Sequence, residues 1–253
     1  MKKIINFDQI NDKHRELVGN KAFNLAKLNE FGFKTADFFV ISNSLFHRAI
    51  EKRALPIDLQ QEIINKLHES KATKFAVRSS ASCEDGKKSS FAGQFESFLS
   101  IPKHKVIRAA EDCFKAVFDE RIGLYCSYHQ VDPSEIKMAV IVQEMIEAQK
   151  GGVIFTHDVF NDDGDSLVIE AAQGLGEQVV SGSANADRLI FSKKKGNLIK
   201  SEPGGKESVL TTGEAKDLFN LALQIETKFG QAQDIEWAIK DQQIYFLQTR
   251  TIT

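Results

Sequence analysis

Cysteine, proline and tryptophan are scarce in this chain, which has three cysteines, four prolines and one tryptophan in 253 residues. Cys83, Cys113 and Cys126 are odd in number and show no CxxC spacing, which argues against a disulfide framework or a structural zinc site. This cysteine usage suits a reducing compartment, so we expect a cytoplasmic protein.

A strong charge of one sign and a long apolar run are also missing. The net charge is −2, so no general field attracts nucleic acid or an anionic membrane. No apolar run reaches the length of a membrane-spanning helix, and the N-terminal residues lack the apolar stretch of a signal peptide. We therefore expect neither nucleic acid nor membrane among the partners. The hydrophobic fraction of 42% is enough for a sizeable core, in one large domain or in two lobes.

Apolar periodicity divides the chain into expected helices and strands. Helical spacing predicts helices over residues 20–31, 56–69, 104–130 and 213–229. Short apolar runs predict strands at residues 38–41, 75–77, 95–101, 138–142, 151–155, 167–169 and 189–191. Helices and strands mix in the first half, and strands dominate the second. We expect an α+β protein with an N-terminal lobe over residues 1–140 and a C-terminal lobe over residues 141–253.

A hairpin is predicted at the C-terminal end, where apolar runs at residues 235–239 and 244–247 flank the polar residues 240–243. A turn of odd length centred on Gln242 sets Glu236 opposite Gln248 and Asp234 opposite Arg250, all on one face. A two-residue turn would instead set Glu236 against an apolar leucine and mix the faces. The odd turn separates polar from apolar side chains better, so we prefer it.

The polar face of this hairpin combines carboxylates, an amide and a guanidinium. Carboxylate oxygens bind Mg²⁺, which often takes substrate phosphates as further ligands. The planar fork of Arg250 suits phosphate oxygens. The face therefore suits a metal and polyphosphate site, although an amphipathic hairpin with a solvated polar face has the same pattern.

Three other segments have residue types suited to binding. Arg78 follows a predicted strand and opens a serine-rich loop over residues 78–90, whose backbone N–H groups suit phosphate. Lys21 stands at the start of a predicted helix, where anions bind favourably. Gln143 follows a strongly apolar strand, where an amide can hydrogen-bond a purine edge or meet solvent. The Gly174–Leu175–Gly176 segment is more typical of a tight turn than of a ligand site.

Six segments occur together and in a set order: GNKAFNLAKL, VRSSASCEDGKKSSFAGQFESFL, VIVQEMI, GVIFTHD, IEAAQGLGEQVVSG and QDIEWAIKDQQIYFLQTRTIT. In order and wording they resemble the ATP-binding domain shared by phosphoenolpyruvate synthase, pyruvate phosphate dikinase and rifampin phosphotransferase. The resemblance runs from about Val18 to Thr253. It implies a two-lobed ATP-grasp fold with nucleotide between the lobes.

The resemblance also implies roles for individual residues toward ATP. It implies that Lys21 and Arg78 contact the phosphates, that Gly93 and Ser97 line the phosphate loop region, and that Gln143 lies at the adenine side.

For the metal, it implies that Glu236 and Gln248 bind Mg²⁺ and that Arg250 closes the site beside the phosphates. Arg78 and Arg250 are then the catalytic residues, because they stabilise charge that develops during phosphoryl transfer.

Two departures from the family pattern qualify the expected function. Asn20 stands where the family usually has a second glycine, and Cys83 replaces a residue that is usually small and apolar. None of the six histidines lies in the context of the family's phosphorylated histidine. We therefore expect an ATP-dependent phosphotransferase domain that passes a phosphoryl group to a histidine on a separate or missing domain. The alternatives are a noncatalytic nucleotide-sensing or interaction module and an ATP-grasp carboxylate ligase.

Overall fold

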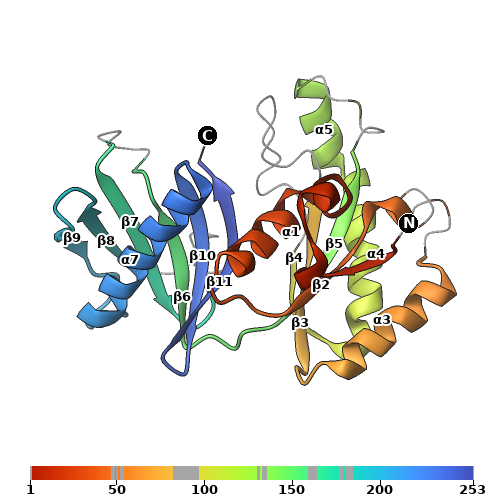
Figure 1. Ribbon diagram of the computed structural model, residues 1–253, viewed down its shortest axis with the longest axis horizontal. Helices are drawn as coiled ribbons and strands as arrows, with labels where there is room; N and C mark the ends of the chain where they lie inside the picture. Colours follow the sequence, from red (N-terminus) through yellow and green to blue (C-terminus); the bar gives the residue numbers. More distant parts are fainter. Residues whose placement is uncertain are drawn as a thin grey trace. The chain divides into compact units, whose positions relative to one another are not determined.

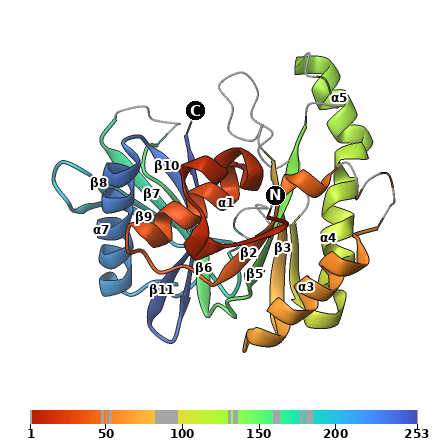
Figure 2. The ribbon, with the colours of Figure 1, turned by 45° about the vertical axis from the view of Figure 1, so that its right-hand side comes forward.

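Two compact units make up the chain in the computed structural model (Figures 1 and 2). Unit 1 comprises Met1–Ala26 and Ala36–Met145, and unit 2 comprises Lys27–Thr35 and Ile146–Thr253. The structure describes residues 2–46, 49, 51, 54–81, 97–129, 132, 136–158, 164–176, 179 and 185–252. Both units combine helices with an antiparallel sheet, so the α+β prediction is confirmed.

Unit 1 contains a five-stranded sheet in the order β1-β2-β5-β3-β4, with every neighbouring pair antiparallel. Its strands are β1 (Ile4–Asn6), β2 (Phe38–Ile41), β3 (Lys74–Ala81), β4 (Ser97–Pro102) and β5 (Met138–Glu144). β2 and β5 are almost entirely buried, which explains why their sequences are mostly apolar.

Unit 1 contains α3 (Ile57–Glu69), α4 (Val106–Lys115), α5 (Glu120–His129) and most of α1 (Arg15–Glu30), whose residues from Lys27 onward belong to unit 2. Single 3₁₀ turns lie at Phe7–Gln9 (η1), Asp12–His14 (η2), Asn43–Leu45 (η3), Lys103–Lys105 (η4) and Ala116–Phe118 (η5). The prediction of one helix over residues 104–130 is wrong, because Asp119 has an extended backbone with ψ of 138° and separates α4 from α5.

The two faces of the unit 1 sheet differ in what covers them. Val77 and Val142 belong to the main apolar core, together with Leu59 and Ile63 of α3 and Phe114 of α4. The opposite face of β3 bears the intervening side chains and lies against α1. The sheet therefore has an apolar face under α3 and α4 and a second face that includes polar residues.

Strand β3 is longer than the sequence predicts. Arg78, Ser79 and Ser80 pair with Ile141, Val140 and Ala139 of β5 and do not begin a loop. Their polarity suggested a loop, but Ser79 and Ser80 are fully buried. The rest of the serine-rich segment, from residue 82, lies outside the described residues.

Unit 2 contains a six-stranded antiparallel sheet in the order β11-β10-β6-β7-β8-β9. Its strands are β6 (Lys150–Phe155), β7 (Ser166–Gln173), β8 (Asp187–Ser192), β9 (Leu198–Glu202), β10 (Gln233–Lys240) and β11 (Gln243–Thr251). The short strands β1 and β9 have no clear pattern of their own in the sequence and were not predicted.

Helix α7 (Thr212–Phe229) packs on one face of the unit 2 sheet. Thr211 and Glu214 form a capping box at its start, and Gly230 ends it in a left-handed conformation with φ of 74°. Phe219 stacks on Phe191 of β8, with ring centroids 4.9 Å apart. Because side chains alternate along a strand, the residues of β10 on this face are Gln233, Ile235, Trp237 and Ile239.

Residues 27–35 extend unit 2 at the β11 edge of its sheet. The backbone N–H of Phe246 donates to the carbonyl of Lys34 at 2.9 Å, and Thr35 forms a parallel bridge with Phe246. The rings of Phe33 and Phe246 meet edge to face, 5.8 Å apart. Among the described residues of both units, no helix is long and apolar enough to cross a membrane.

Candidate functional site

The hairpin of β10 and β11 has the predicted polar pairs, but its turn differs from the predicted one. Asp234 pairs with Arg250, and Glu236 pairs with Gln248, as expected. The predicted odd turn is wrong, because Lys240 pairs with Gln243 and leaves a two-residue turn between them.

A β-bulge corrects the register beyond this tight turn. Trp237 pairs with Phe246, whereas the residue before it, Glu236, pairs with Gln248. Leu247 is therefore the extra residue. Asp241 and Gln242 of the turn both have positive φ, 50° and 62°, as a type I′ hairpin turn requires. The tight turn and the bulge together sort the polar side chains onto one face.

Asp234 and Arg250 form a close ion pair on this face. The Nη2 and Nε atoms of Arg250 lie 2.6 Å and 2.7 Å from the same carboxylate oxygen, Oδ2 of Asp234. The Asp234 side chain is 11% exposed and that of Arg250 is 34% exposed. The carboxylate therefore fixes the guanidinium while leaving part of it accessible to an anion.

Glu236 belongs to a row of side chains, polar except for Val153, that crosses the sheet. Register places Gln248, Glu236, Val153, Glu170 and Arg188 side by side on successive strands, from β11 to β8. This row lies on the face away from α7, because β10 alternates between the two faces. Sequence reasoning missed Glu170 and Arg188, whose common face depends on strand pairings distant in sequence.

Arg188 is surrounded by carboxylates at the far end of the row. Its guanidinium nitrogens lie 3.6 Å from Asp158, 3.8 Å from Glu170 and 3.7 Å from Glu202. Asp158 is almost fully buried, with a side chain 1% exposed. A buried carboxylate needs a positive partner, so Arg188 compensates this charge.

Unit 1 brings the start of α1 against β3. Gly19 interrupts α1 with φ of 77° and ψ of 165°, and a Cβ there would meet the carbonyl oxygen of Ser80 at 2.3 Å. The backbone N–H of Ala22 donates to Oγ of Ser80 at 3.2 Å. Asn20 lies within the helix and does not have a positive φ. The backbone conformation that requires glycine is therefore adopted by Gly19 and not by Asn20.

Four of the predicted binding residues lie in unit 1 among the described residues. Lys21 is half-buried and precedes Ala22, the residue that contacts Ser80. Arg78 lies two residues before Ser80 on the same face of β3. Ser97 of β4 pairs directly with Arg78. Gly93 lies outside the described residues.

Gln143 is the fourth, and it lies within β5 rather than after it. It pairs with Phe38 on one side and with Ala76 on the other, on the same sheet face as Arg78. The residue is 2% exposed, and among the described residues its Nε2 has no hydrogen-bond partner. A buried donor without an acceptor costs about 1–3 kcal/mol, so this amide suits a ligand that supplies one.

The Gly174–Leu175–Gly176 segment has a packing role. A Cβ on Gly176 would lie 2.7 Å from the backbone N of Gly152, and one on Gly151 would lie 2.6 Å from the N of Gly176. The segment after β7 therefore packs directly on the backbone of β6, which requires glycine on both sides.

The family described as pyruvate phosphate dikinase, AMP/ATP-binding domain, matches residues 47–213 and 201–253 of the chain. The match covers most of the chain, and the protein belongs to this family.

Curated relatives agree with the family and are much longer. A probable phosphoenolpyruvate synthase of Methanocaldococcus jannaschii is 34% identical over 247 residues, which cover 86% of this chain and 21% of that protein. A probable phosphoenolpyruvate synthase of Archaeoglobus fulgidus is 35% identical, covering 94% of this chain and 40% of that protein. A rifampicin phosphotransferase of Bacillus cereus is 28% identical, covering 99% and 36%. The chain thus spans less than half the length of each.

A solved structure overlaps the chain more loosely. The D-alanyl-alanine synthetase A of Vibrio cholerae is 10% identical with a TM-score of 0.44, and the overlap covers 92% of this chain and 55% of that one. An overlap this loose supports no functional inference.

Proposed function

We propose that the chain is the ATP-binding part of a phosphotransferase, which takes MgATP and passes a phosphoryl group to a histidine on a separate domain or chain. The observation that carries this proposal is the polar face of β10 and β11. There a carboxylate and an amide oppose each other beside a fixed guanidinium. Membership of an AMP/ATP-binding family supports the choice of nucleotide.

The residues of this face fit a magnesium ion by their chemistry. Glu236 offers carboxylate oxygens, and Gln248, directly opposite, offers a carbonyl oxygen. Magnesium takes such hard oxygen ligands and keeps further positions for water and phosphate. When bound, the ion neutralises phosphate charge. We propose Glu236 and Gln248 as its ligands.

The remaining residues then have distinct roles toward ATP. Arg250, fixed by Asp234, and Arg78, beside Ser97, supply guanidinium donors for phosphate oxygens. Lys21 adds a charge at the start of the main part of α1. Gln143 supplies the buried amide for the edge of the adenine ring. We include Gly93 in the phosphate loop region on the family resemblance alone, and cytoplasmic placement on cysteine usage.

Binding of ATP tests the first part of the proposal. Titration calorimetry with and without Mg²⁺ should show that Glu236→Gln loses most of the magnesium-dependent gain in affinity. Arg250→Lys, which keeps the charge but loses the fork, should bind ATP at least about tenfold more weakly. Lys240→Ala is the matched control, since Lys240 lies on the same strand and face. Equal ATP affinity in all four proteins would refute the site.

Transfer of phosphate tests the second part. The chain is incubated with labelled MgATP and candidate histidine-bearing carrier domains, and acid-labile label on a carrier histidine is the expected result. ATP binding without transfer to any carrier would favour a nucleotide-sensing module instead.

A further inference from the structure

A buried hydrogen bond between two side chains lies on the α7 face of the hairpin, directly behind the proposed magnesium and phosphate site. The hydroxyl of Thr249 on β11 donates to Oε1 of Gln233 on β10, with 2.8 Å between the two oxygens. Both residues are fully buried. Gln248 and Arg250, the neighbours of Thr249 along the strand, point to the opposite face, because side chains alternate. Thr249 therefore lies between the two residues that β11 contributes to the site.

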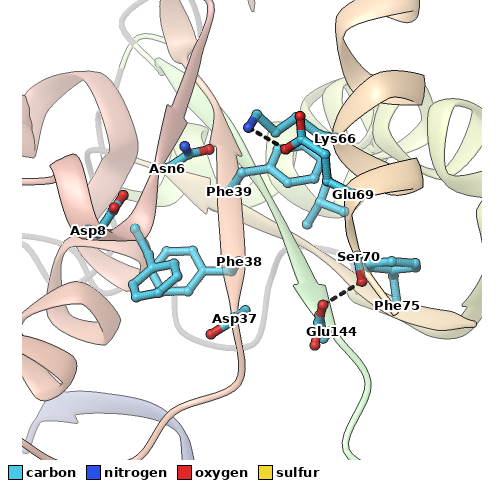
Figure 3. Close-up of a pocket in the computed structure, with 12 residues that line it drawn as sticks. Asn6, Asp8, Asp37, Phe38, Phe39, Lys66, Glu69, Ser70, Phe75 and Glu144 are labelled. Atoms are coloured by element: carbon cyan, nitrogen blue, oxygen red, sulfur yellow. Dashed lines mark hydrogen bonds and ion pairs between the residues drawn. The ribbon is translucent and has the colours of Figure 1, made fainter. Parts of the chain in front are cut away.

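The burial of this hydrogen bond sets it apart from side-chain contacts near the surface. In unit 1, for example, Lys66 pairs with Glu69 and Ser70 donates to Glu144 at partly exposed positions, where water can replace a lost partner (Figure 3). Behind the hairpin, the loss of one partner leaves a buried polar atom without a hydrogen bond. Two apolar side chains would fill the same position without this cost, so the polar pair argues for a demand on geometry rather than on stability.

The amide of Gln233 is held in one orientation. Its Nε2 donates to the backbone carbonyls of Gln231 and Ala232, both at 3.2 Å, which leaves Oε1 to accept from Thr249. Rotating the amide by half a turn would point Oε1 at two carbonyl oxygens and lose both bonds. The backbone N–H of Gln233 also donates to Oγ1 of Thr156, just after β6, at 2.8 Å. The acceptor for the Thr249 hydroxyl is therefore fixed in place.

Strand β11 has few other contacts that fix it at this point. It is the edge strand of the sheet, and among the residues that the structure describes, 248–251 pair with β10 alone. The bulge at Leu247 directly precedes them, and a bulge bends and twists its strand. The hydrogen bond also forms only in the bulged register, because a regular strand after the two-residue turn would set Thr249 opposite Asp234, on the site face.

We propose that Gln233 and Thr249 are positioning residues of the ATP site, and that their hydrogen bond holds Gln248 and Arg250 in the orientation that magnesium and phosphate require. The inference rests on the proposed function, since it concerns the same hairpin. Binding residues work well only when they are held within about 0.5 Å of the productive geometry. Asp234 fixes the guanidinium of Arg250, whereas the buried hydrogen bond fixes the strand that carries it.

Thr249→Val tests the proposal, because valine keeps the shape of threonine and removes the hydroxyl. In titration calorimetry with the full chain, we expect this variant to bind MgATP at least about fivefold more weakly than the wild type. Thr249→Ser keeps the hydroxyl and should restore most of the affinity. Gln233→Met removes the acceptor instead and should repeat the loss. Ser42→Ala, which deletes a fully buried hydroxyl from unit 1, is the matched control and should bind MgATP like the wild type.

A double-mutant cycle separates positioning from a merely structural role. In an Arg250→Lys background, Thr249→Val should cost less MgATP affinity than in the wild type, because the side chain that it positions is already lost. Circular dichroism checks that each variant is folded. Equal MgATP affinity in the wild type, Thr249→Val and Gln233→Met would overturn the positioning role alone, and so would strictly additive losses in the cycle. A wild type that does not bind MgATP would overturn the proposed function as well.

Discussion

Replacing Gly19 by alanine should destabilise the protein strongly, because two separate costs add. Its φ of 77° and ψ of 165° fall in a region that essentially only glycine occupies, which costs another residue about 1–3 kcal/mol. The new Cβ would also lie 2.3 Å from the carbonyl oxygen and 2.5 Å from Oγ of Ser80. Ser80 belongs to β3, which is held between β4 and β5, so relief requires a backbone shift costing about 1–3 kcal/mol.

Gly32→Ala is the control that separates the two costs. Gly32 also has positive φ, 88°, but a Cβ there would meet nothing within 4 Å. Its expected cost is therefore conformational alone, about 1–2 kcal/mol. We expect Gly19→Ala to melt about 4–8 °C below Gly32→Ala in scanning calorimetry, since about 2 kcal/mol separates them and each kcal/mol moves the midpoint by about 2–4 °C.

The reasoning fails if the two alanine variants melt together. That result would mean that the start of α1 moves away from β3 at no cost, so the close approach of Gly19 to Ser80 would not be a fixed feature. Calorimetry is preferred to tryptophan fluorescence here, because the single tryptophan, Trp237, reports on unit 2.

Two further predictions concern unit 2. Burial opposes ionisation of Glu214, but hydrogen bonds from Lys150 and Thr211 outweigh it and hold its pKa below the usual value. A carboxyl group whose pKa is lowered in the folded state contributes to folding stability at pH values above its pKa in the unfolded chain. This contribution is lost as the pH falls through the pKa of the folded state. The wild type should therefore lose its midpoint advantage over Glu214→Gln as the pH falls below about 4, and parallel pH profiles would contradict this. Gln242→Gly should raise the midpoint by about 2–8 °C, because Gln242 has φ of 62°, which costs a non-glycine residue about 1–2 kcal/mol. Gln243→Gly, at the start of β11, should lower it, and equal shifts would refute the turn assignment.

The hairpin shows what sequence patterning can and cannot predict. Alternation of polar and apolar residues placed Asp234 opposite Arg250 correctly, because burial of one sheet face fixes which residues share it. The same alternation favoured an odd turn, since it assumes that both strands are regular. The actual solution, a tight turn followed by a bulge at Leu247, gives the same pairing with an irregular strand. The polar–apolar pattern thus predicts which residues pair across the hairpin better than it predicts the turn length and the bulge that bring them together.

The order of the strands in the sheet, which depends on pairings distant in sequence, is why the other residues of the site could not be predicted. Glu170 and Arg188 share a face with Glu236 only because β6 lies between β10 and β7, and no local pattern encodes that order. The break at Asp119 was missed for a related reason, since apolar residues continue on both sides of it. Local periodicity identifies elements, whereas the pairing of distant strands assembles them.

Polar residues on two interior strands, β3 and β10, support the proposed function. Arg78 lies on β3, between β4 and β5, and Glu236 lies on β10, between β6 and β11. A central strand usually buries apolar side chains, so its polarity misled the prediction that β3 ends before Arg78. Local preference and final structure disagree most often where a protein retains residues for binding rather than stability. The wrong strand end at Arg78 is therefore in line with the proposal that this residue binds phosphate.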